Sequence, residues 1–272
     1  MNVASIQMVS SSSVQANCDA ARRLLAQAAI QGAELAVLPE YFCLLGFKDT
    51  DKLPIAEKPG HGPLQDFLSQ CAIDFKLWIV GGTVPLVTDL SGERQTHVYN
   101  STLVFDPSGQ RVARYDKMHL FRFDDGQNKF DETRVLRPGV QPVSFDLPSV
   151  DGSTYRIGLS ICYDLRFPEL YRQLKADVLL VPSAFTFTTG QAHWEILLRA
   201  RAIENLAYVV AAAQGGVHEN TRRTWGHSMV VDPWGVILAQ HSEGEAVVMA
   251  EVHMARLMAE RLRLPSLGHC VL

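Results

Sequence analysis

Short apolar segments alternate with helix-like segments over the first 80 residues of the chain. Val3–Met8, Ala33–Leu38 and Leu77–Val80 are apolar runs of strand length, and Gln15–Gln31 and Pro63–Phe75 have the apolar spacing of amphipathic helices. Such alternation predicts βαβ units, in which helices cover a partly parallel sheet. The chain is therefore restricted to folds of the α/β class.

The rest of the chain adds hairpins to this pattern. Turn residues between apolar runs predict hairpins over 101–115, 143–161 and 228–240. Helices are predicted at Pro168–Lys175, Ala192–Leu206 and Met254–Arg263, and strands at Asp177–Val181, Tyr208–Ala213 and Ala246–Val252. Because no low-complexity linker divides the chain, we expect one domain over residues 1–272, with helices covering mixed parallel and antiparallel sheet.

Composition narrows the class of function. The chain has 272 residues, 47% of them apolar and 20% charged, with a net charge of −4. This balance gives no general attraction to nucleic acid or to an anionic membrane, so neither is an expected partner. An anionic substrate would need a local cluster of positive groups. No segment approaches the ~20 apolar residues of a membrane span, and no signal peptide is evident.

Cysteine and histidine usage argues against metal or disulfide chemistry. The five cysteines are scattered without CxxC pairs, and the nine histidines show no HxH or HxxxH spacing. We therefore expect no metal, no cofactor, a reducing compartment and a cytoplasmic location.

One cysteine stands in a setting that suits a nucleophile. The apolar run Tyr155–Ile161 ends at Cys162, and Pro168 and Glu169 then mark the start of a helix. We expect the thiol at the exposed tip of a strand, beside backbone N–H groups. The alternative, a small buried hydrophobic residue, fits this segment equally well.

Two further strand ends carry charge. Glu40 follows an apolar strand and Pro39, in surroundings where a carboxyl group suits a general base, although an ordinary loop glutamate gives the same pattern. Lys117 ends the hairpin strand Arg111–Tyr115, and its alternative is a surface lysine. Functional groups of open α/β sheets gather at strand ends, so a base, a cation and a nucleophile are expected together.

These segments resemble the three blocks of the nitrilase superfamily of carbon–nitrogen hydrolases. The blocks are Pro39-Glu40, Tyr115–Leu120 and Ser160–Glu169. The resemblance implies a Glu40–Lys117–Cys162 triad, with Glu132 as a fourth residue that orients Lys117. It also implies a four-layer αββα sandwich and a homodimer or larger homo-oligomer. An acyl-enzyme thioester would form on Cys162, with the backbone N–H of Tyr163 and Lys117 receiving the oxyanion.

Two stretches, 192–204 and 226–235, resemble the Nit branch, within it the deaminated glutathione amidases. The implied reaction is hydrolysis of deaminated glutathione to 2-oxoglutarate and cysteinylglycine. One alternative is ω-amidase action on α-ketoglutaramate or a similar small dicarboxylate monoamide. The other is a non-catalytic or moonlighting interaction protein.

A small anionic amide needs cationic and apolar contacts. Arg166 is placed to bind a carboxylate bidentately, and Phe185, Phe187 and Thr189 follow a strand end and are candidates for the pocket wall. Arg222 and Arg223 are either distal carboxylate contacts or solvated loop residues.

Overall fold

The computed structural model describes residues 1–88, 96–124, 126 and 129–271. Its helices are α1 (Val14–Ile30), α2 (Pro63–Phe75), α3 (Pro168–Leu174), α4 (Phe187–Asn205) and α5 (Met254–Arg263). Local signals set their ends: the Ser13 hydroxyl accepts from Ala16 N at 3.3 Å at the start of α1, and α2 and α3 begin at prolines. Among the described residues, no helix is long and apolar enough to cross a membrane.

Two mixed sheets form the centre of the molecule. The first has the order β17-β1-β2-β3-β5-β4, with β6 paired to β5, and the second has the order β16-β15-β12-β11-β10-β9. The strands of the first are β1 (Asn2–Gln7), β2 (Leu35–Val37), β3 (Trp78–Val80), β4 (Val84–Val87), β5 (Val98–Phe105), β6 (Arg111–Asp116) and β17 (Ala246–Glu251). Those of the second are β9 (Ser144–Pro148), β10 (Thr154–Leu159), β11 (Val178–Leu180), β12 (Tyr208–Ala211), β15 (Ser228–Val231) and β16 (Ile237–His241).

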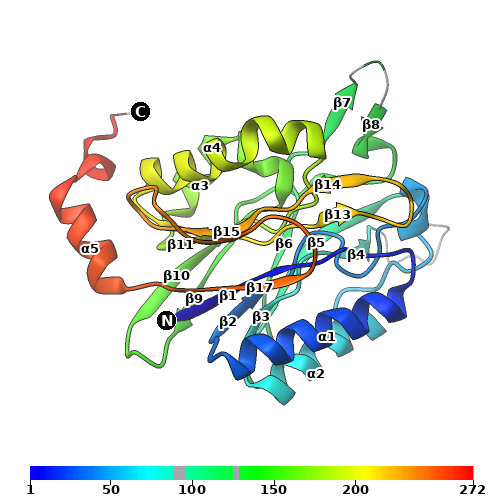
Figure 1. The fold of residues 1–272 in the computed structure, drawn as a ribbon, viewed down its shortest axis with the longest axis horizontal. Helices are drawn as coiled ribbons and strands as arrows, with labels where there is room; N and C mark the ends of the chain where they lie inside the picture. Colours follow the sequence, from blue (N-terminus) through cyan, green and yellow to red (C-terminus); the bar gives the residue numbers. More distant parts are fainter. Residues whose placement is uncertain (89–95, 125, 127–128, 272) are drawn as a thin grey trace.

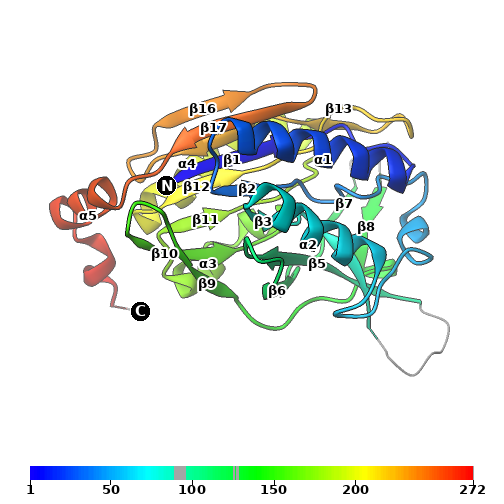
Figure 2. The ribbon, with the colours of Figure 1, turned by 90° about the horizontal axis from the view of Figure 1, so that it is seen from below.

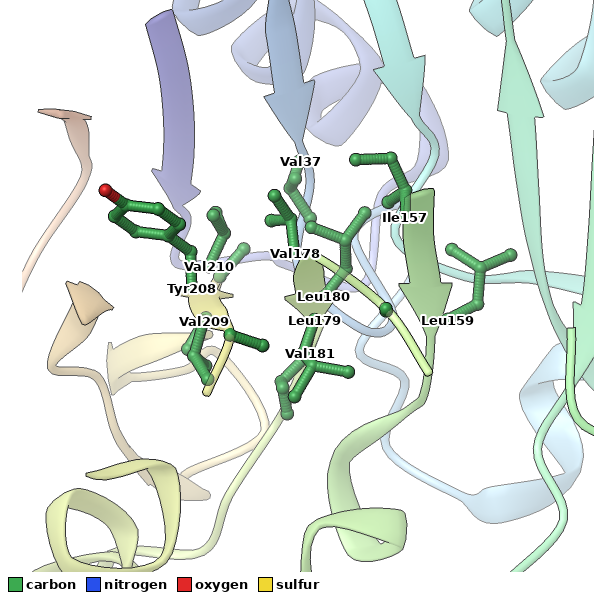
Figure 3. Close-up of a cluster of buried hydrophobic side chains, with 14 of the residues drawn as sticks. Val37, Ile157, Leu159, Val178, Leu179, Leu180, Val181, Tyr208, Val209 and Val210 are labelled. Atoms are coloured by element: carbon green, nitrogen blue, oxygen red, sulfur yellow. The ribbon is translucent and has the colours of Figure 1, made fainter. Parts of the chain in front are cut away.

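The layers stack as helix, sheet, sheet and helix. Helices α1 and α2 lie on one side of the molecule and α3 and α4 on the other, with the strands between them (Figures 1 and 2). One core cluster joins the two sheets, for example Val37 of β2 with Ile157 and Leu180 (Figure 3). A second cluster joins the first sheet to α1 and α2. The expected four-layer αββα sandwich is thus confirmed.

Several short elements do not follow from the sequence pattern. They are β4, β7 (Arg122–Asp124), β8 (Lys129–Asp131), β13 (Gly215–Val217) and β14 (Arg223–Trp225). Three-residue strands are too short to show a period, and β4 contains Pro85, which an edge strand tolerates. Helix α4 begins five residues before the predicted Ala192, although its first turns contain two threonines and a glycine of low helix propensity. Packing explains the glycine in this turn, since a Cβ on Gly190 would lie 2.3 Å from Trp225 Cβ.

The central strand β11 gives a test of the core. Leu180 has no exposed surface, and truncation to alanine should leave a cavity between the sheets. We expect Leu180→Ala to lower the free energy of unfolding by about 2–5 kcal/mol in urea titration. Ile30→Ala, at a side chain that is 86% exposed, is the control and should change it by less than about 0.5 kcal/mol. Equal effects of the two variants would contradict the assigned core.

Candidate active site

The structure brings the three charged or nucleophilic strand ends into one cavity. Glu40 follows β2, Lys117 follows β6, and Cys162 follows β10. All three line a cavity of about 30 Å³ together with Glu132. The four residues that the sequence predicted as catalytic therefore share one enclosed space.

Glu40 is held by hydrogen bonds on both carboxylate oxygens. Its side chain is 1% exposed. Oε1 accepts from Asn100 Nδ2 at 2.8 Å and from Lys117 Nζ at 2.9 Å, and Oε2 accepts from the Ala184 amide at 2.9 Å. The surroundings are therefore more polar than the flanking aromatic residues indicated. The next residue, Tyr41, has φ of 57°, so the chain turns sharply away directly after the carboxylate.

Lys117 bridges two carboxylates in the interior. Its ammonium, on a side chain 1% exposed, donates to Glu40 Oε1 and to Glu132 Oε1, each at 2.9 Å. Burial alone would lower the pKa of Lys117, but the negative charges of Glu132 and Glu40 raise this pKa well above its ordinary value. Lys117 therefore stays positively charged at neutral pH and does not release a proton there.

Glu132 anchors the other side of the lysine. It begins a short 3₁₀ helix (Glu132–Arg134), and its Oε1 also accepts from the Tyr41 hydroxyl at 2.9 Å. Oε2 accepts from the Phe121 amide at 2.7 Å. Burial would raise the pKa of Glu132, but the Lys117 charge and the Phe121 N–H outweigh it and lower that pKa. Glu132 is thus a carboxylate that is held by Tyr41 and Phe121 and that orients Lys117.

Cys162 occupies a strained turn. Its φ of 50° lies in the left-handed region, at the first residue of a 3₁₀ helix (Cys162–Arg166). The residue is only 8% exposed, so the expectation of an exposed strand tip was wrong: the side chain points into the enclosed cavity. Burial and the negative charge of Glu40 raise the pKa of the Cys162 thiol. The positive charge of Lys117 lowers it, but the net result is a pKa well above the ordinary value. The resting thiol is protonated at neutral pH and needs a base to react.

Asp164 ties the nucleophile turn to the lysine segment, a role that the sequence did not reveal. Its Oδ2 accepts from the Ile161 amide at 2.8 Å and the Tyr115 hydroxyl at 2.7 Å. Its Oδ1 accepts from the His119 amide at 3.0 Å and lies 2.7 Å from His119 Nδ1, which must carry the proton because a carboxylate only accepts. The buried carboxylate therefore fixes the backbone on both sides of the cavity.

The predicted substrate contacts divide into two groups. Tyr163, Phe185 and Thr189 line the cavity. The Arg166 guanidinium instead stacks behind the wall, 5.7 Å from the Tyr163 ring centre and 5.6 Å from that of Phe185, and Phe187 lies in an adjoining groove. Substrate binding by Arg166 and Phe187 stays a prediction. Arg222, whose role the sequence left open, lines the cavity.

A larger cavity of about 680 Å³ lies elsewhere, beside α3 and the C-terminal segment. Arg172, Lys175 and Cys270 are among its lining residues. The smaller cavity is instead lined by Glu40, Lys117 and Cys162, and it is therefore the candidate active site.

Loss of the Asp164 charge gives a test of its positioning role. Asp164→Asn places a donor group opposite existing donors, and each buried group left unpaired costs about 1–3 kcal/mol. We expect a loss of at least that size in the free energy of unfolding, measured in urea. Asp146→Asn, at an exposed carboxylate on β9, is the matched control. An unchanged stability of Asp164→Asn would show that the four contacts do not hold the turn.

The lowered pKa of Glu132 makes a prediction about acid stability. A carboxyl group whose pKa is lower in the folded state stabilises the fold above its unfolded-state value of 4.5, and this contribution is lost as pH falls through the folded-state pKa. We expect the free energy of unfolding to fall less steeply with decreasing pH below 4.5 in Glu132→Gln than in the wild type. Glu169→Gln, at an exposed glutamate, controls for loss of a carboxyl group. Parallel pH profiles of wild type and Glu132→Gln would refute the assigned direction.

Comparison with known proteins places this geometry in a family. Residues 2–261 match the carbon–nitrogen hydrolase family. The chain is 42% identical to the deaminated glutathione amidase of Synechocystis over 98% of its own length and 97% of that protein. The crystal structure of Caenorhabditis elegans NitFhit superposes with a TM-score of 0.87 at 36% identity, covering 99% of this chain and 65% of that longer one.

A second similar structure carries a covalent adduct in its active site. It is a variant of the amidase from Nesterenkonia sp. AN1, with the acetamide moiety of fluoroacetamide covalently attached to the active-site cysteine. It superposes with a TM-score of 0.78 at 25% identity, covering 100% of this chain and 97% of that one. The family match, the full-length similarity and the shared fold agree, and the chain belongs to the carbon–nitrogen hydrolase family.

Proposed function

We propose that this protein is a cysteine-dependent amidase that hydrolyses deaminated glutathione to 2-oxoglutarate and cysteinylglycine through a thioester on Cys162. The observation that carries the proposal is the buried Glu40–Lys117 contact at 2.9 Å beside a protonated thiol. The substrate is supported by the full-length similarity to the Synechocystis enzyme.

In the first half-reaction, Glu40 accepts the thiol proton of Cys162 as the sulfur attacks the scissile carbonyl carbon. The developing negative charge on the carbonyl oxygen is received by the Lys117 ammonium and the Tyr163 backbone N–H. Losing one such donor typically costs about 3–4 kcal/mol of barrier. Because Lys117 is already charged, this stabilisation requires no proton transfer.

The tetrahedral intermediate then collapses. The carbon–nitrogen bond breaks, and Glu40 gives its proton to the departing amine. Cysteinylglycine is released, and a 2-oxoglutaryl thioester remains on Cys162. In the second half-reaction, Glu40 takes a proton from water, whose oxygen attacks the thioester carbon. The carbon–sulfur bond breaks, the thiolate regains the proton from Glu40, and 2-oxoglutarate is released. Glu40 thus carries one proton in each half-reaction.

Cations line the cavity and suit an anionic substrate. Lys117 and Arg222 supply two positive charges in the lining, and Glu40 and Glu132 supply two negative ones. Because Lys117 already contacts both carboxylates, the Arg222 guanidinium is the lining cation that suits an amide bearing a carboxylate. Lys52 lies behind the lining, with its ammonium 4.7 Å from the ring centre of Tyr41, and burial lowers its pKa.

The protein's assembly and location belong to the same proposal. Apolar side chains on the outer helices are exposed in the isolated chain, among them Ile196 on α4 at 70% and Leu262 on α5 at 84%. Exposed apolar side chains of this kind support a homodimer or larger homo-oligomer that covers these helices. The scattered cysteines support a cytoplasmic location.

The triad variants give the test of the reaction. We expect Cys162→Ala to abolish release of 2-oxoglutarate from deaminated glutathione, and Glu40→Gln to slow it by ~10²–10⁴-fold, since each lacks a group that the chemistry needs. Cys270→Ala, at an exposed cysteine, is the control and should retain wild-type turnover. A 2-oxoglutaryl adduct on Cys162 should be detectable by mass spectrometry after rapid quenching.

Three outcomes would point elsewhere. A clear kinetic preference for α-ketoglutaramate would assign the protein as an ω-amidase. Absence of both turnover and adduct with any small amide would favour a non-catalytic interaction protein. Full activity of Cys162→Ala would exclude the thioester.

A further inference from the structure

A second cavity adjoins the candidate active site. This outer groove, of about 320 Å³, is lined by Phe123 and Phe130 of β7 and β8, by residues 186–188 at the start of α4, and by residues 221–223. It shares two lining residues, Thr186 and Arg222, with the reactive cavity. Arg222 therefore stands where the two spaces meet.

The sizes of the two spaces assign them different parts of a substrate. The reactive cavity, at about 30 Å³, has room for little more than a reacting amide group, whereas the outer groove has the volume of an ordinary small-molecule site. Portions of a substrate beyond the scissile amide must extend toward the groove, and so past Arg222.

Among the residues that the structure describes, the Arg222 guanidinium has an aromatic partner and no carboxylate partner. Its ring contact is with Phe130, 5.2 Å from the guanidinium carbon to the ring centre, and no carboxylate in the described ranges lies within ion-pair distance. The neighbouring arginines are engaged differently. Arg166 lies 3.3 Å from His193 Nδ1, and Arg223 stacks on Phe187 and lies 3.8 Å from Glu243.

The loop that carries Arg222 is anchored before any substrate binds. The His218 amide donates to the Arg222 carbonyl at 2.9 Å, and the Arg222 amide donates to Asn220 Oδ1 at 3.0 Å. Asn220 in turn donates to the Gly46 carbonyl at 2.6 Å. His218 is buried and spans Ser10 and Thr224 with its ring nitrogens, at 2.8 and 2.7 Å. Because the backbone that carries the guanidinium is already fixed, the loop loses little freedom when Arg222 binds an anion.

We infer that Arg222 binds a carboxylate of the amide substrate at the junction of the reactive cavity and the outer groove, and so selects anionic amides over neutral ones. The inference rests on the proposed function and names a specificity residue for it. A guanidinium presents paired N–H donors that match a carboxylate, and within the described part of the chain its contact is with the Phe130 ring.

Deaminated glutathione has a carboxylate on each side of the scissile amide, and three further substrates separate them. α-Ketoglutaramate retains only the acyl-side carboxylate, N-butyryl-cysteinylglycine retains only the leaving-group carboxylate, and butyramide has neither. For Arg222→Gln we expect kcat/KM to fall ~10- to 100-fold with the amides that carry the contacted carboxylate and less than ~3-fold with butyramide. A fall confined to one single-carboxylate amide identifies the carboxylate bound.

Three variants make the test specific. Arg222→Lys keeps the charge but not the bidentate geometry and should lie between wild type and Arg222→Gln. Arg23→Gln, at an exposed arginine of α1, should behave as wild type. If Arg222→Gln lowers kcat/KM equally for charged and neutral amides, the inference is overturned. It is also overturned if Arg223→Gln reduces the preference for charged amides as much as Arg222→Gln or more.

A binding measurement separates this inference from the proposed reaction. In the Cys162→Ser background, calorimetry with 2-oxoglutarate and with cysteinylglycine should show at least ~10-fold weaker binding of one of them when Arg222 is also changed to Gln. Equal affinities with and without Arg222 would overturn the inference even if turnover is normal. Absence of turnover with Arg222-dependent binding retained would overturn the proposed reaction alone.

Discussion

The buried contact of one ammonium with two carboxylates is the interaction on which the site depends. Taking Lys117 out of water costs several kcal/mol unless close opposite charges compensate. Glu40 and Glu132 do so at 2.9 Å each, and both are themselves held by amide N–H groups. Removing either carboxylate would leave Lys117 with one ion-pair partner instead of two, and removing Lys117 would leave two buried carboxylates without their shared cation. The network therefore constrains three separate segments of the chain to one geometry.

That network also fixes which group moves protons. The pKa of Lys117 is raised and that of Glu132 lowered, so both keep their charges at neutral pH. The Cys162 thiol is neutral instead. Burial raises its pKa, and a thiolate would be repelled by the negative charge of Glu40. Proton transfer from sulfur is therefore favourable only as the sulfur begins to bond to carbon, and the carboxylate beside it is the group that can accept.

Sequence reasoning located the groups that sit at strand ends and missed those that support them. Glu40 and Cys162 follow apolar runs, and Lys117 follows a hairpin strand, and these segments can be recognised along the chain. Asn100 and Asp164 could not be found this way, because their roles arise from partners distant in sequence: Asn100 contacts a carboxylate 60 residues away. The burial of Cys162 was missed for the same reason, since the walls of its cavity come from several other segments.

The supports for chemistry and for substrate choice come from different parts of the fold. The reacting groups follow strands of the two central sheets and are locked by buried bonds such as those of Asp164. Arg222 and the outer groove come instead from a surface loop and the hairpin β7–β8, which projects from the body (Figure 1). Loops on a rigid scaffold can change without disturbing the strands that they leave. The same proposed triad can therefore act on different amides. The groups at the sheet ends determine the reaction, and the groove determines the substrate.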